Sequence, residues 1–143
     1  YLQWIGETMG SEYQGYFPEF SGRRMSLHAA MLAVQEYEQT LSRRLIDGLR
    51  NLAGVVVRGI SNQNDFSRRV PTVSFTVKNQ NPEEIALKLA EENIFIWHGH
   101  NYALEAIRMM ELEESGGVVR IGPVHYNTVE EIDCALEVLK TCW

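Results

Sequence analysis

A long amphipathic pattern over residues 26–52 constrains the fold of this chain more than any other feature. Apolar residues recur there at spacings of three and four, which is one face of a helix: Leu27, Ala30, Met31, Val34, Tyr37, Leu41, Leu45 and Leu49. Gly54 stands where such a helix is expected to end. The sequence therefore predicts one long helix near the start of the chain.

Four shorter segments have the composition of β-strands. Residues 55–57 are a β-branched run, and residues 70–77 alternate apolar and polar side chains, so we expect these two strands to pair in antiparallel fashion. The segment between them, residues 61–69, is polar and is expected to be a loop. Residues 94–97 predict a buried strand, and residues 118–121 predict another.

Capping signals locate the remaining helices. Asn81, followed by a proline and two acids, opens a helix that runs to about residue 92. Thr128 and Glu131 have the spacing of a capping box before the last helix. Residues 101–113 have a helical pattern, and residues 1–9 are consistent with a short helix. This order predicts an α+β fold, with a small, mostly antiparallel sheet covered by helices.

Composition and charge exclude several classes of function. The 143 residues fit a single domain with a real core, and the net charge of -6 disfavours nucleic acid and anionic membranes as partners. No apolar run approaches the roughly 20 residues that span a bilayer, and no signal peptide is visible. Cys134 and Cys142 lie eight residues apart on one predicted helix, about 12 Å along its axis and too far for a disulfide. A reducing, cytoplasmic setting is the simplest inference.

Polar groups cluster where two of the predicted strands end. Arg120 lies in an apolar run, and its guanidinium is suited either to a substrate carboxylate or to a salt bridge with an acid at the edge of the core. His98 and His100 have the spacing of a chelating pair, and with His125 they define an alternative metal site. Local hydrogen bonding in a loop is the simpler interpretation of these histidines, so no metal is expected. Gly99 between them permits close backbone approach.

Two motifs in this order resemble the cysteine desulfurases of the class V aminotransferase superfamily. Residues 93–102 read N-I-F-I-W-H-G-H-N-Y, where that family has G-I-A-V-R-T-G-H-H-C. Residues 119–128 read V-R-I-G-P-V-H-Y-N-T and are followed by E-E-I-D, where the family has V-R-A-S-x-x-x-Y-N-T-x-E-E-I-D. The long leading helix fits the same C-terminal small domain. The match is closest to the branch often labelled isopenicillin N epimerase.

The resemblance implies that the chain is the C-terminal small domain of a fold-type I enzyme that uses pyridoxal phosphate. In such enzymes the large domain holds the Schiff-base lysine, and the small domain closes over an amino-acid substrate. Arg120 falls on the family arginine that binds the substrate carboxylate, and the segment His98, Gly99, His100, Asn101 and Tyr102 falls on the mobile catalytic loop. The resemblance further implies a homodimer in the full-length form.

Two departures from the family pattern bear on the chemistry. Tyr102 stands where desulfurases have the cysteine that attacks sulfur, and a phenol of pKa about 10 cannot replace a thiolate as sulfur acceptor. Transamination, racemisation or epimerisation, and elimination thereby become alternatives to desulfuration. None of the lysines, Lys78, Lys88 and Lys140, lies in the expected cofactor motif, so the cofactor lysine is expected outside this chain and the fragment alone is expected to be inactive.

Two further expectations concern organisation and the competing function. Residues 1–25 contain an aromatic loop, with Tyr13, Tyr16, Phe17 and Phe20, which is expected to contact the missing large domain or a second subunit. The alternative to an enzyme is a free-standing α+β module that binds a small carboxylate ligand through Arg120, without catalysis.

Overall fold

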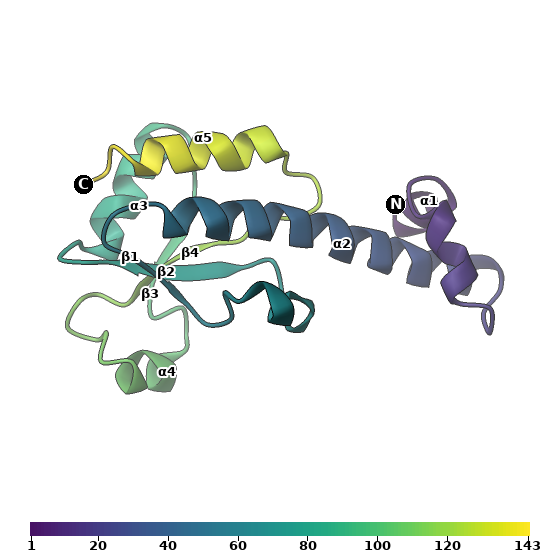
Figure 1. Ribbon diagram of the computed structural model, residues 1–143, viewed down its shortest axis with the longest axis horizontal. Coiled ribbons are helices and arrows are strands. Elements are labelled where there is room, and N and C mark those ends of the chain that lie inside the picture. The colour runs from purple at the N-terminus through teal and green to yellow at the C-terminus, as the bar shows by residue number, and fades with distance from the viewer. The chain divides into compact units, whose positions relative to one another are not determined.

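The computed structural model describes the backbone of residues 1–143 and every side chain except that of residue 63, and the chain forms two compact units, Tyr1–Thr40 and Leu41–Trp143 (Figure 1). Helix α2 (Gly22–Arg50) begins in the first unit and ends in the second. The long helix predicted over residues 26–52 is thus confirmed, with its start four residues earlier. No described helix combines the length and apolar composition that crossing a membrane requires.

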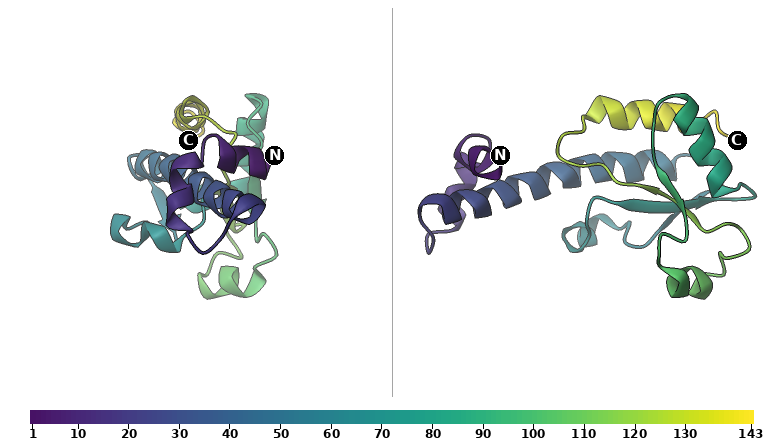
Figure 2. Two further views of the ribbon diagram at one scale, coloured as in Figure 1. Left: turned by 90° about the vertical axis from the view of Figure 1, so that its right-hand side faces the viewer. Right: turned by 180° about the vertical axis from the view of Figure 1, so that it is seen from behind.

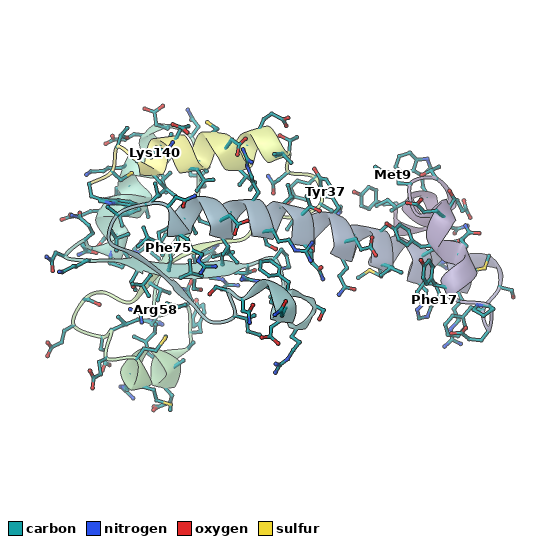
Figure 3. The ribbon with its side chains drawn as sticks, in the orientation of Figure 1. Met9, Phe17, Tyr37, Arg58, Phe75 and Lys140 are labelled. Atoms are coloured by element: carbon teal, nitrogen blue, oxygen red, sulfur yellow. The ribbon has the colours of Figure 1, made fainter. Side chains whose placement is uncertain are left out.

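The first unit packs two short helices against the beginning of α2. Helix α1 (Leu2–Glu7) approaches it so closely that a Cβ on Gly6 would lie 1.8 Å from the carbonyl oxygen of Ser26. The predicted aromatic loop contains the 3-10 helix η1 (Ser11–Tyr16), whose Tyr13 hydroxyl donates to Glu36 at 2.7 Å. Met9 and Phe17 of this unit are labelled in Figure 3. In this unit the apolar stripe of α2 is only partly covered, and Met31 remains 56% exposed.

The second unit is built on a four-stranded antiparallel sheet in the order β1-β2-β4-β3. Its strands are β1 (Val55–Arg58), β2 (Val73–Val77), β3 (Trp97–Gly99) and β4 (Val118–Ile121). The predicted pairing of the first two strands and the α+β class are both confirmed. Strand β2 begins three residues later than predicted, after Pro71, which has no N–H to donate to a ladder.

Helices cover one face of this sheet. The end of α2, α3 (Pro82–Glu91) and α5 (Val129–Leu139) enclose a core with the inward side chains of β2 and β4. Phe75 and Val119 lie fully buried in that core. Helix α4 (Leu104–Met109) lies on the opposite side of the sheet, as both side views show (Figure 2), and forms a small cluster of Ile107, Leu112 and Val118. Within the second unit, as far as the structure describes it, no other helix lies over that face (Figure 2).

The two predicted caps are present. The Asn81 side chain accepts from the backbone N–H of Glu83 at 2.9 Å, with Pro82 in the first helical position of α3. Thr128 and Glu131 form a complete capping box at the start of α5. These caps satisfy helix N–H groups that have no intrahelical partner.

The strand prediction for residues 94–97 is wrong in extent and burial. Strand β3 begins only at Trp97 and lies at the edge of the sheet. Ile94 and Ile96 pack against the main core, whereas Phe95 and Trp97 are 81% and 68% exposed. A continuous apolar run cannot distinguish a strand covered on both faces from one covered on a single face, and here only the helix-side face is covered.

Three other predictions need correction. The helix expected over residues 101–113 is confined to Leu104–Met109, because Asn101 and Tyr102 both have positive φ. The polar loop of residues 61–69 contains the 3-10 helix η2 (Gln63–Arg68), and Phe66 in it is buried in the core. Helix α5 ends at Leu139, so Cys142 lies beyond the helix that contains Cys134; both thiols are free.

Candidate functional site

Arg120 lies on the uncovered face of the sheet. Its neighbours on β4, Val119 and Ile121, face the helical side and are buried, while the Arg120 side chain is exposed. The antiparallel register places Ser74 opposite Arg120 on one side and Trp97 opposite it on the other. Since residues directly opposite each other point to the same face, these three side chains form one row across the sheet.

The guanidinium of Arg120 has no partner within the described part of the chain. No ion pair or side-chain hydrogen bond involves it among residues 1–62 and 64–143. The salt bridge that the sequence left open as the alternative is therefore not formed there. An unpaired, permanently charged fork at the surface is free to bind a carboxylate through two parallel hydrogen bonds.

The segment that follows β3 is a tight loop with unusual backbone angles. Gly99 has φ +95°, Asn101 +49° and Tyr102 +61°. The backbone N–H of Tyr102 donates to Nδ1 of His100 at 3.1 Å, and the Asn101 amide group donates to the carbonyl oxygen of Gly99 at 3.1 Å. Positive φ in two consecutive residues other than glycine is uncommon, and strained backbone of this kind clusters at functional sites.

The Asn101 side chain has an unsatisfied acceptor. Its Oδ1 is buried and has no hydrogen-bond donor among the described residues. Because the carbonyl of Gly99 can only accept, the amide end of Asn101 must face it, and the oxygen is the end left without a donor. An unpaired buried acceptor destabilises by about 1–3 kcal/mol, which adds to the strain of the loop.

Arg120 shares a shallow pocket of about 490 Å³ with the end of this loop. Of the residues predicted for the site, the pocket brings together Arg120, Asn101 and Tyr102. His98, Gly99 and His100 do not line it. His98 lies on the edge strand β3, where it is paired with Val119 of β4. The remaining lining residues are Thr72, Phe95, Ile96, Trp97 and Gly122.

Sequence reasoning did not assign the aromatic wall of this pocket to the site. Phe95 and Trp97 were interpreted as buried strand residues, yet they alternate with Ile94 and Ile96. That alternation is the signal in the sequence that could have placed them on the uncovered face. The register that sets Trp97 opposite Arg120 depends on the strand order, which no local pattern reveals.

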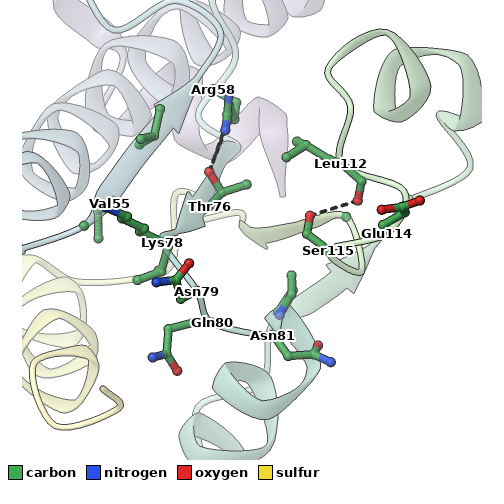
Figure 4. Close-up of a pocket in the computed structure, with 15 residues that line it drawn as sticks. Val55, Arg58, Thr76, Lys78, Asn79, Gln80, Asn81, Leu112, Glu114 and Ser115 are labelled. Carbon is green, nitrogen blue, oxygen red and sulfur yellow. Dashed lines mark hydrogen bonds between the residues drawn. The ribbon is translucent and has the colours of Figure 1, made fainter.

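A second and larger hollow, of about 740 Å³, lies on the sheet beside the turn between β2 and α3 (Figure 4). Arg58 lines it and donates two hydrogen bonds to Oγ1 of Thr76, at 3.1 and 2.9 Å. Arg58 occupies the same cross-strand row as Arg120, on the far side of Ser74. Unlike Arg120, it is held by a neighbour within the sheet.

The described residues place no lysine beside Arg120 for the attachment of pyridoxal phosphate, the cofactor implied by the resemblance. A lysine is required for its covalent attachment, and none lines the pocket of Arg120. Lys88 donates to the carbonyl oxygen of Cys142, Lys140 pairs with Glu137, and Lys78 lines the other hollow. The Arg120 pocket offers a cation that suits an anionic group such as a carboxylate, but no lysine for attachment of the cofactor.

The alternative of a metal site on the histidines has no geometric support. Within the part of the chain that the structure describes, no three His, Cys, Asp or Glu side chains gather where they could hold a metal ion. His100 uses Nδ1 as an acceptor from the Tyr102 backbone, and its ring stands edge-on to the tyrosine with centroids 6.1 Å apart. Local hydrogen bonding in the loop is what the geometry favours for this histidine.

The sequence is similar to one protein family and to several curated proteins. The family described as "Aminotransferase class-V" matches residues 24–134. An aminotransferase-like protein, FGM3, from Gibberella zeae is 36% identical over 76% of this chain and 27% of its own length. A probable cysteine desulfurase from Methanothermobacter thermautotrophicus is 34% identical over 59% of this chain and 21% of its own length. The chain thus spans about a quarter of the length of these curated relatives.

Solved structures resemble the fold over a similar share. The apo cysteine desulfurase of Thermococcus onnurineus NA1 superposes with a TM-score of 0.67 at 24% identity, covering 84% of this chain and 30% of that one. The cysteine desulfurase CsdA of Escherichia coli gives a TM-score of 0.66 at 16% identity, over 82% and 29%. At these identities the likeness concerns the fold alone.

Proposed function

The chain belongs to the class V aminotransferase family, and from that premise we propose that it is the C-terminal small domain of a longer pyridoxal-phosphate enzyme. In this proposal the enzyme acts on an amino acid, and Arg120 binds the α-carboxylate of the substrate. The observation that supports it most directly is the unpaired guanidinium of Arg120 in a pocket on the uncovered face. Class V aminotransferases and cysteine desulfurases are pyridoxal-phosphate enzymes, which supports the choice of cofactor.

Arg120 would orient the substrate. The cofactor, when bound, supplies an electron sink for the carbanion formed at the substrate Cα. A carboxylate held by two parallel hydrogen bonds from one planar fork loses its rotational freedom, so the bonds at Cα take a fixed direction. The rigid sheet beneath Arg120, with Val119 and Ile121 anchored in the core, keeps the fork in place.

The loop of Gly99–Tyr102 would close one side of the same pocket. Tyr102 is 92% exposed and lines the pocket, so its ring is available to cover a bound substrate and exclude water. A phenol at this position does not support sulfur transfer through a persulfide. We therefore propose a reaction on the amino acid that needs no thiol nucleophile, such as transamination, racemisation or elimination.

The cofactor assignment is tested on the full-length enzyme by its visible absorbance before and after borohydride reduction. A yellow protein that bleaches on reduction would support a lysine-bound cofactor outside this chain. A colourless protein that takes up no added pyridoxal phosphate would refute the enzymatic proposal. It would favour the alternative, a module that binds a small carboxylate through Arg120 without catalysis.

The role of Arg120 is tested by Arg120→Ala in the full-length enzyme. We expect KM for the amino-acid substrate to rise by the equivalent of about 2–5 kcal/mol, roughly 30-fold to several thousandfold, as a charge-paired contact is deleted. Arg58→Ala is the matched control, because this arginine lies in the same cross-strand row but lines the other hollow. An unchanged KM in Arg120→Ala, or an equal rise in both variants, would contradict the assignment.

A further inference from the structure

Three aromatic side chains line the pocket of Arg120, and all are largely exposed. Phe95 is 81%, Trp97 68% and Tyr102 92% exposed, and each lines the pocket together with Arg120. Among the described residues of its lining, the pocket has one cation and no acid. An apolar group that covers these aromatic surfaces removes them from water, which lowers the free energy and favours binding.

Trp97 is the aromatic residue that the register of the sheet places opposite Arg120. The register of β3 and β4 sets Trp97 directly opposite Arg120, and both point to the uncovered face. In an antiparallel pair the Cβ atoms of opposite residues lie about 4.5–5.5 Å apart. A ligand whose carboxylate binds the guanidinium therefore has its next few carbon atoms beside the indole.

We propose that Trp97 makes this site selective for amino acids with a large apolar or aromatic side chain, with the α-carboxylate on Arg120 and the side chain against the indole. The inference rests on the proposed function and names the substrate class of the same pocket. Phe95 and Tyr102 extend the apolar wall beyond Trp97.

The charge distribution argues against an acidic side chain on the substrate. Within this chain the pocket lining supplies a single cation, which the α-carboxylate occupies, so a second carboxylate gains no charge partner from these residues. Arg58, the other arginine of the row, is separated from Arg120 by Ser74 and directs its Nε and Nη2 to Thr76. A small thiol or hydroxyl side chain would leave much of the aromatic surface of Phe95, Trp97 and Tyr102 uncovered.

The test uses two carboxylates without an amino group, so that binding is measured apart from cofactor chemistry. Isothermal titration calorimetry on the full-length enzyme compares 3-phenylpropionate with propionate. We expect the wild-type enzyme to bind 3-phenylpropionate about 30-fold more tightly, since the phenyl group is buried against the wall. Trp97→Ala should lower this ratio at least tenfold, because propionate loses only the contact of two carbon atoms with the indole, whereas 3-phenylpropionate also loses that of its ring. Retained binding of propionate also shows that the variant is folded.

Two further variants separate the possible causes. Trp97→Phe keeps an aromatic ring and should retain most of the preference. Leu87→Ala removes another exposed apolar side chain, 60% exposed on α3 and outside the pocket, and should leave both affinities as they are. Arg120→Ala should weaken both ligands alike.

The outcomes distinguish this inference from the function on which it rests. A wild-type ratio near one, or a Trp97→Ala variant that weakens both carboxylates equally, overturns the selectivity of Trp97 and leaves Arg120 as the carboxylate ligand. Unchanged affinities in Arg120→Ala overturn the carboxylate site itself, and the inference with it.

Discussion

Replacing Gly117 by alanine tests the closest backbone approach beside the candidate site. A Cβ on Gly117 would lie 2.4 Å from the carbonyl oxygen of Gly99 and 2.5 Å from its carbonyl carbon. These are backbone atoms of β3, so no side chain can turn aside to relieve the overlap. Gly116 offers a matched control: its φ of +87° is close to the +92° of Gly117, but its nearest atoms are 3.4 Å away.

The expected loss of unfolding free energy has two parts, the backbone strain of alanine at positive φ and the steric overlap of its Cβ. Placing alanine at such a φ destabilises by roughly 1–3 kcal/mol, offset by about 0.4–1 kcal/mol because alanine restricts the unfolded chain. Gly116→Ala should therefore lower the free energy of unfolding by about 1–2 kcal/mol. Gly117→Ala adds an overlap of the kind that overpacked sites show, about 1–3 kcal/mol, for a total of roughly 2–5 kcal/mol.

Urea unfolding followed by tryptophan fluorescence measures both losses. Because Gly99 pairs with Val118 at the end of β3, relief of the overlap should also move the loop that contains Tyr102. We therefore expect Gly117→Ala to weaken carboxylate binding in the full-length enzyme, and Gly116→Ala to leave it intact. Equal losses of stability in the two variants would refute the reasoning, since strain alone would then explain both.

Three smaller predictions concern titration and reactivity. The backbone N–H of residue 128, followed by the amide of residue 127, lowers the pKa of Glu131. The stability advantage of wild type over Glu131→Gln is therefore present at neutral pH and should shrink as pH falls from about 5 to 3; an advantage independent of pH would contradict this. The hydrogen bond that the Tyr13 hydroxyl donates to Glu36 raises the pKa of Tyr13 to about 12. Ultraviolet titration should find this phenol among the last to ionise, and Glu36→Gln should return its pKa toward 10. Burial raises the pKa of the Cys142 thiol, whereas Cys134 is exposed, so a thiol reagent should modify Cys134 first in the native protein; equal rates would show that the C-terminal segment opens readily.

Local signals sufficed for much of the fold. The cap at Asn81 and the capping box at Thr128 depend only on neighbours three or fewer residues away, and both are present as predicted. The stripe of α2 correctly identified Leu41, Leu45 and Leu49 as core residues. The same stripe did not foretell that Met31 stays exposed, because periodicity shows which side chains share a face and not whether anything covers it.

The site was accessible to sequence reasoning only in part. Arg120 and the loop segment were selected from their residue types and from the family resemblance. That Trp97 lies opposite Arg120 follows from a long-range strand order, in which β4 sits between β2 and β3. The sequence predicts that a helix begins at Asn101, but Asn101 and Tyr102 have positive φ values and belong to a loop. Contacts within that loop, such as the hydrogen bond from the Tyr102 backbone to His100, outweigh the helix propensity of the segment.

Stability and turnover favour different residues at the position of Tyr102. A left-handed conformation penalises a side chain of this kind by roughly 1–2 kcal/mol, whereas glycine adopts it freely and asparagine with less strain. A library of variants selected for thermal resistance alone should therefore drift to glycine or asparagine at position 102. A library selected for turnover should keep the aromatic ring, if that ring covers the substrate. The residue that survives at this one position reports which pressure prevailed.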